Sequence, residues 1–72
     1  MIRGELERDL ALIERDIASE YRRPAELMTQ GAERDRRLAL AALHLKIAEL
    51  REQLADFYDQ VVALERTSNS LE

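Results

Sequence analysis

His44 is the only histidine in the 72-residue chain, and histidine is the residue type best suited to acid-base catalysis near neutral pH. Catalysis needs a neighbouring group that orients the ring, and metal binding needs further ligands. The residues three and four positions away along a helix are all apolar, so none of them meets either need. These residues are Leu40, Ala41, Ile47 and Ala48. The favoured interpretation is a structural histidine that flanks a helical seam, and no catalytic residue is predicted.

Three carboxylates follow at helical spacing and would share a face: Glu49, Glu52 and Asp56. Carboxylate oxygens are suitable ligands for a divalent cation. Neighbouring acids on an exposed helix are more often a solvated face, however, and a chain without cysteine and with a single histidine is poorly equipped for zinc. We therefore predict no metal and no cofactor.

Five arginines gather in the middle of the chain, and guanidinium groups are suited to phosphate binding. They are Arg22, Arg23, Arg34, Arg36 and Arg37. Acidic residues are interleaved with them, and the net charge of the chain is −4. Pairing of Glu33 with Arg36 and Arg37 along one helix is the simpler explanation. A small regulator that binds RNA or DNA through this arginine-rich segment is the alternative functional hypothesis.

Motifs for other chemistry are missing from the sequence. There is no glycine-rich phosphate loop, no cysteine, and no serine beside the histidine, so we expect a non-enzymatic protein. The N-terminus is charged throughout, unlike a secretory signal, and no apolar run approaches the roughly 20 residues that cross a membrane. We expect a soluble, cytoplasmic protein.

The composition favours helix almost everywhere, with only two glycines and one proline, so the predicted fold class is all-α. A first helix is expected over residues 2–21. Its apolar residues recur every three or four positions and form one stripe. The stripe consists of Ile2, Leu6, Leu10, Ile13, Ile17 and Tyr21.

Pro24 interrupts this pattern, because proline lacks an N–H and biases the preceding residue away from helix. We expect residues 22–31 to connect two antiparallel helices, with a short helical segment after Pro24 that ends at Gly31. The rival interpretation is a kinked first helix that runs through Pro24 as far as Gln30.

The second helix, expected over residues 32–66, carries two apolar lines about 150° apart. One line has the spacing of a and d positions in a heptad repeat. It consists of Leu40, Leu43, Ile47, Leu50, Leu54, Phe57, Val61 and Leu64. The other line consists of Leu38, Ala41, Leu45, Ala48, Ala55 and Val62.

A single hairpin gives each helix one neighbour, so the first helix would cover the heptad line and the line of Leu38 and Leu45 would need another partner. The helices also differ in length, at about 30 Å and about 52 Å. A chain of this size buries only about 60% of its surface, and without disulfide or metal it is expected to oligomerise. Two hairpins that form a four-helix bundle would resolve these problems. The predicted interface residues are Leu38, Ala41, Leu45, Ala48, Leu54, Phe57, Tyr58, Val61 and Val62.

Charges are segregated along the chain and indicate how the copies would align. Residues 22–48 carry six basic and three acidic side chains, whereas residues 49–72 carry two and six. An antiparallel homodimer would set each basic turn against an acidic end. Leu27 and Met28 in the connection are candidates for binding a different protein.

The last residues, 67–72, lack a helical apolar pattern and are expected to be disordered, and Leu71 and Glu72 resemble a cloning scar. Residues 1–66 then form a single domain. The functional hypothesis is a small adaptor, co-chaperone or assembly factor that self-associates and can receive an amphipathic helix from a client protein.

Overall fold

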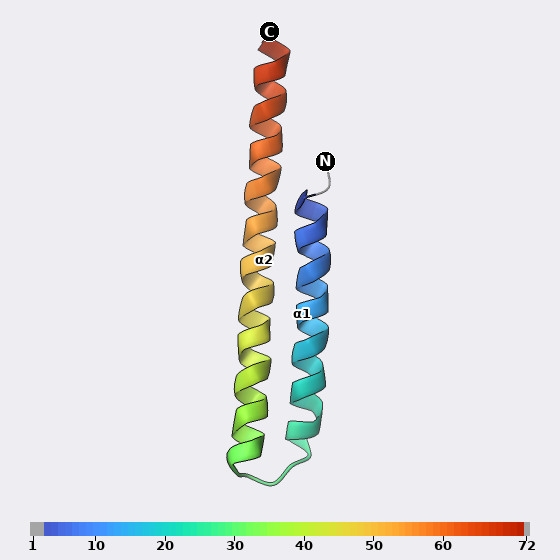
Figure 1. The fold of residues 1–72 in the computed structure, drawn as a ribbon, viewed down its shortest axis with the longest axis vertical. Helices are drawn as coiled ribbons and strands as arrows, with labels where there is room; N and C mark the ends of the chain where they lie inside the picture. The colour runs from blue at the N-terminus through green and yellow to red at the C-terminus, as the bar shows by residue number, and fades with distance from the viewer. Residues whose placement is uncertain (1–2, 72) are drawn as a thin grey trace.

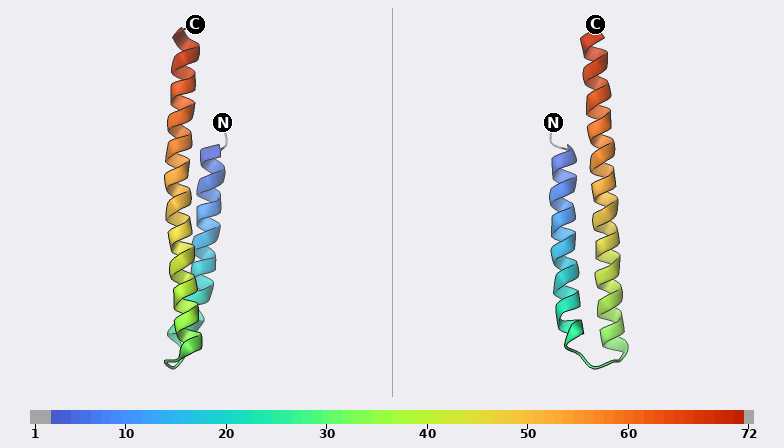
Figure 2. Two further views of the ribbon diagram at one scale, coloured as in Figure 1. Left: turned by 60° about the vertical axis from the view of Figure 1, so that its left-hand side comes forward. Right: turned by 180° about the vertical axis from the view of Figure 1, so that it is seen from behind.

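Two antiparallel helices, α1 (Arg3–Glu26) and α2 (Ala32–Leu71), and the turn between them make up the described part of the chain (Figure 1). The computed structural model describes the backbone of residues 3–71 and the side chains of residues 3–67. The Cα atoms span 64 × 14 × 10 Å, so the molecule is long and narrow. The helices lie side by side in every view (Figure 2). The predicted all-α helical hairpin is confirmed.

Helix α1 passes through Pro24 and ends two residues later, at Glu26. Pro24 falls in the last turn, and its missing N–H leaves the Glu20 carbonyl without the hydrogen bond that a continuous helix would give it. Beyond it, the Leu27 N–H donates to the Pro24 carbonyl at 3.1 Å, and the Met28 N–H donates to the Ala25 carbonyl at 3.1 Å. These shorter-range bonds tighten the end of the helix. The expected helix end near Tyr21 is therefore wrong.

The connection between the helices covers residues 27–31, which is shorter than the expected 22–31, and it contains no short helical segment. Gly31 does not adopt a positive φ. Its carbonyl instead accepts the N–H of Asp35 at 3.0 Å, so Gly31 begins α2 rather than ending a preceding helix. Arg34 Nε donates to the Ala25 carbonyl at 3.2 Å and ties the start of α2 to the end of α1.

Helix α2 extends beyond the N-terminus of α1 (Figure 1). Arg3, the first residue of α1, donates from Nη1 to the Tyr58 hydroxyl at 3.0 Å, so most of α2 beyond Tyr58 has no helix beside it. We call this part of α2, residues 59–71, the overhang. The described backbone of α2 continues as helix to Leu71, the expected disorder over 67–72 stays a prediction, and Glu72 lies outside the described residues.

The helices meet through small residues, which we call the small-residue seam. Each of these residues is seven positions from the next on its own helix, and seven residues are two helical turns. The seam consists of Gly4, Ala11, Ala18 and Ala25 on α1 and of Ala41, Ala48 and Ala55 on α2. These alanines are the only buried hydrophobic residues among the described side chains, at 0–4% exposure.

The seam reverses one sequence-based interpretation. We expected α1 to cover the heptad line of α2, which contains Leu43 and Phe57, and a second chain to cover the line of Leu38 and Leu45. Ala48, which belongs to the second line, is instead fully buried within the chain, and Leu43 and Phe57 are each 61% exposed. Helices packed through methyl groups lie close together, and bulkier side chains are left beside or outside the contact.

Candidate interaction surface

Large apolar side chains of both helices lie on one side of the hairpin and along its outer edges, and we call this surface the apolar face. Each stands one position before or two positions after a residue in the register of the small-residue seam. An antiparallel helix pair has an approximate two-fold axis perpendicular to its plane, so equal offsets fall on the same side. The face consists of Leu6, Leu10, Ile13 and Ile17 of α1 and of Leu40, Leu43, Ile47, Leu50, Leu54, Phe57, Val61 and Leu64 of α2.

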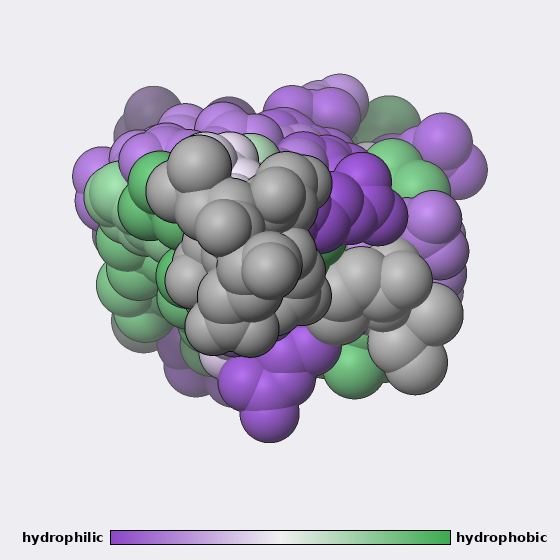
Figure 3. Space-filling view, turned by 90° about the horizontal axis from the view of Figure 1, so that it is seen from above, coloured by the Kyte–Doolittle hydropathy of each residue, from purple (hydrophilic) through white to green (hydrophobic). Residues whose placement is uncertain are grey.

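Most of this face is open to solvent. Leu50 is 53% exposed, Leu6 is 52% exposed and Leu64, on the overhang, is 71% exposed. Figure 3, which looks along the hairpin from above, shows hydrophobic side chains gathered along the outer flank of α2 and hydrophilic ones along another side. Contiguous apolar surface of this kind on a small protein marks a site of association.

Two polar pairs between the helices lie beside the seam, on the same side as the apolar face. Arg51 Nη1 donates to Glu7 Oε2 at 2.9 Å, and His44 Nδ1 lies 2.5 Å from Glu14 Oε2. Glu7 and Glu14 are largely covered, at 13% and 18% side-chain exposure. The Nε of Arg51 is buried and has no hydrogen-bond partner in the single chain.

His44 is therefore held by α1, and sequence reasoning missed this arrangement. The ring stacks on Tyr21 with 5.7 Å between centroids, while Glu14 binds Nδ1. Only neighbours on its own helix were considered, and those are apolar. Glu14 and His44 each stand three positions after a seam alanine, and this shared offset is the signal that could have paired them. No group of metal-binding side chains occurs within the described part of the chain.

The acidic side chains of α2 join the two helices on the other side of the seam. Glu52 accepts from Arg15 Nη2 at 2.7 Å. Asp56 and Asp59 accept from Arg8 Nη2 at 3.1 Å and 2.6 Å. Their hydrogen bonds raise the pKa of Arg8 above its usual value, Asp59 having the larger effect. These carboxylates thus serve as partners for arginines of α1.

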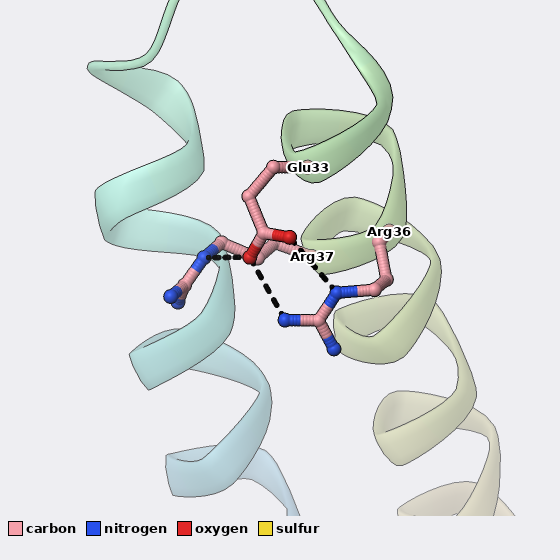
Figure 4. Close-up of polar contacts among 3 residues, drawn as sticks. All are labelled: Glu33, Arg36 and Arg37. Atoms are coloured by element: carbon pink, nitrogen blue, oxygen red, sulfur yellow. Dashed lines mark hydrogen bonds and ion pairs between the residues drawn. The ribbon is translucent and has the colours of Figure 1, made fainter.

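Four of the five arginines near the turn, all except the exposed Arg23, make polar contacts within the chain. Glu33 binds Arg36 at 2.8 Å and Arg37 at 3.0 Å, as the simpler sequence interpretation expected (Figure 4). Hydrogen bonding by Arg36 lowers the pKa of Glu33. Arg22 lies 3.4 Å from Glu26 along α1. A phosphate would compete with these contacts, which gives no support to a nucleic-acid site.

The nine predicted interface residues divide into three groups. Ala41 and Ala48 are buried in the small-residue seam, so assigning them to a second chain is wrong. Four are half-buried: Leu38, Leu45, Tyr58 and Val62. The remaining three, Leu54, Phe57 and Val61, are exposed on the apolar face at 39%, 61% and 49%.

The connection presents one further exposed side chain. Leu27 is 91% exposed, whereas Met28 is half-buried. Neither described helix has the length and apolar content that a bilayer crossing requires. Comparison of the chain with protein-family models, with curated proteins and with solved structures found no match.

Proposed function

We propose that this protein is a helical interaction module whose apolar face binds a second copy of the chain to form a four-helix bundle. One observation carries the proposal. No side chain larger than alanine is buried among the described residues, while a continuous row of leucines, isoleucines and Phe57 lies exposed. The proposal replaces the line through Leu38 and Leu45 with the apolar face as the surface of association.

The energetics of the single chain support association. Removing a leucine or phenylalanine fully from water contributes about 1.5–3 kcal/mol, and the hairpin makes little use of this term. A small chain without disulfide or metal gains such stabilisation by burying side chains against another molecule. Face-to-face packing of two hairpins would remove most of the exposed apolar row of each copy from water at once.

The same face also suits a helix of a client protein, and this chain would then act as an adaptor, co-chaperone or assembly factor. An amphipathic helix with apolar residues three and four positions apart can lie in a groove between two helices. Such a helix would compete with the second copy for the apolar face. Association driven by apolar burial would depend weakly on salt, which separates this role from phosphate binding.

The decisive experiment is a molar-mass measurement by light scattering on the whole chain and on two matched variants. Leu50→Glu places a charge on the apolar face, at a residue 53% exposed, and should yield a monomer with reduced helicity. Leu12→Glu introduces the same charge at a residue 61% exposed that stands one position after Ala11, on the other side of the seam. It should remain dimeric.

Thermal unfolding gives an independent readout of the same proposal. The melting temperature of an obligate dimer rises with protein concentration by mass action. We expect such a rise for the unmodified chain and for Leu12→Glu. A monomeric mass and a constant melting temperature across a wide concentration range would overturn the proposal.

A further inference from the structure

We infer that the second copy lies antiparallel on the apolar face, with each α2 packed against the other α2 about an axis near Glu52. This inference rests on the proposed self-association and adds its orientation and register. It follows from the unequal lengths of the helices and from the two ends of the apolar stripe on α2, which runs from Leu40 to Leu64.

Symmetry leaves two ways to pack aligned hairpins face to face. If both turns lie at the same end, each α2 faces the other α1. If the turns lie at opposite ends, each α2 faces the other α2 and each α1 faces the other α1. The two arrangements differ in whether the second copy covers the overhang.

Only the antiparallel arrangement covers the overhang. Val61 and Leu64 are 49% and 71% exposed, because α1 begins beside Tyr58. With turns at the same end, the α1 of the second copy would begin at that same level and would leave both overhangs bare. With turns at opposite ends, the other α2 runs along the whole stripe and covers both residues.

The register of the two copies follows from where the apolar stripe of α2 begins and ends. The next heptad positions before Leu40 and after Leu64 are occupied by Arg36 and Ser68, so the apolar stripe of α2 is centred on Glu52. An axis at this point places Leu64 over the partner's Leu40. It also places Phe57 over the partner's Ile47, and every large residue of the stripe meets another.

The charges beside the proposed axis are compatible with it. Arg51 Nη1 donates to Glu7 Oε2 at 2.9 Å within each chain. Near the axis, the Glu7–Arg51 pairs of the two copies lie close together, and two arginines are balanced by two glutamates.

The test uses the absence of cysteine from the sequence and two exposed glutamines at equivalent heptad positions. In the antiparallel register, Gln53 meets the partner's Gln53 beside the axis. Gln60 is about 24 Å along the helix from the partner's Gln60. Gln53→Cys and Gln60→Cys are each treated with a short bismaleimide cross-linker, and their molar masses are measured before treatment.

We expect both variants to be dimers in solution, with covalent dimer forming from Gln53→Cys at least ten times faster than from Gln60→Cys. Dimers in which the two variants react equally, or not at all, would overturn the antiparallel register and leave self-association standing. Monomers at every concentration would overturn the proposed function, and this inference with it.

Discussion

Glu14 Oε2 lies 2.5 Å from His44 Nδ1, and this contact joins α1 to α2 beside the small-residue seam. Both side chains are largely covered, at 18% and 24% exposure. Tyr21 stacks on the imidazole and limits its rotation. We therefore expect this contact to stabilise the relative register of the two helices more than an exposed ion pair does.

A double-mutant cycle measures the energy of this contact. Glu14→Gln, His44→Gln and the double variant should give a coupling free energy of roughly 1–3 kcal/mol in urea unfolding at constant protein concentration. The same cycle on Lys46 and Glu49, an exposed pair 3.7 Å apart, should give less than about 0.5 kcal/mol. Additive effects at Glu14 and His44 would show that the pair does not couple the helices.

Enlarging a seam residue should separate the helices. Ala48 is fully buried, so Ala48→Leu forces side chains or backbone to shift and should cost about 1–3 kcal/mol of unfolding free energy. Ala42 is exposed on the same helix, and Ala42→Leu should change stability by less than about 0.5 kcal/mol. Thermal melts followed by circular dichroism provide the comparison, and equal melting temperatures for the two variants would contradict the close packing at the seam.

Removing the arginine that binds the end of α1 should loosen the turn. Arg34→Ala leaves the Ala25 carbonyl without the guanidinium donor and should lower the unfolding free energy by about 0.5–1.5 kcal/mol. Amide exchange should accelerate at Leu27 and Met28, whose N–H groups bond to the last turn of α1. Lys46→Ala, at an exposed site, serves as the control. Unchanged exchange in Arg34→Ala would argue against this capping role.

The carboxylate of Glu33 should titrate below its usual pKa, because it accepts hydrogen bonds from Arg36 and Arg37. A carboxyl group with a lowered folded-state pKa stabilises the fold above its unfolded pKa. That contribution disappears as the pH falls through the folded value. Carboxyl NMR shifts should place the Glu33 midpoint below that of an exposed glutamate, and Arg36→Gln should raise it. An unshifted midpoint in the unmodified chain would exclude the interaction in solution.

The hairpin could be predicted from composition and periodicity, but the choice of buried stripe could not be made by ranking residues by hydrophobicity. Leu43, Leu50 and Phe57 are the stronger apolar signal, and they are exposed. The informative pattern was the weaker one, in which small residues recur every seven positions on both helices, as at Ala11 and Ala48. Such matched spacing indicates a close approach, because helix separation is set by the side chains in contact.

Contacts between the helices were harder to predict than the helices themselves. The partner of His44 lies thirty positions away, at Glu14, so a search along one helix could not find it. The end of α1 was misplaced because the helix accommodates Pro24 and continues to Glu26, although proline has no N–H to donate to the Glu20 carbonyl.

A hairpin joined through methyl groups is a strip with almost no interior, and the Cα atoms of this one span only 10 Å in the thinnest direction. In a globular protein, a mutation that adds an apolar side chain is often absorbed by repacking of the core. Here every described side chain outside the seam is half-buried or exposed. We therefore expect an added apolar side chain to alter the surface that the molecule offers for association more than its interior.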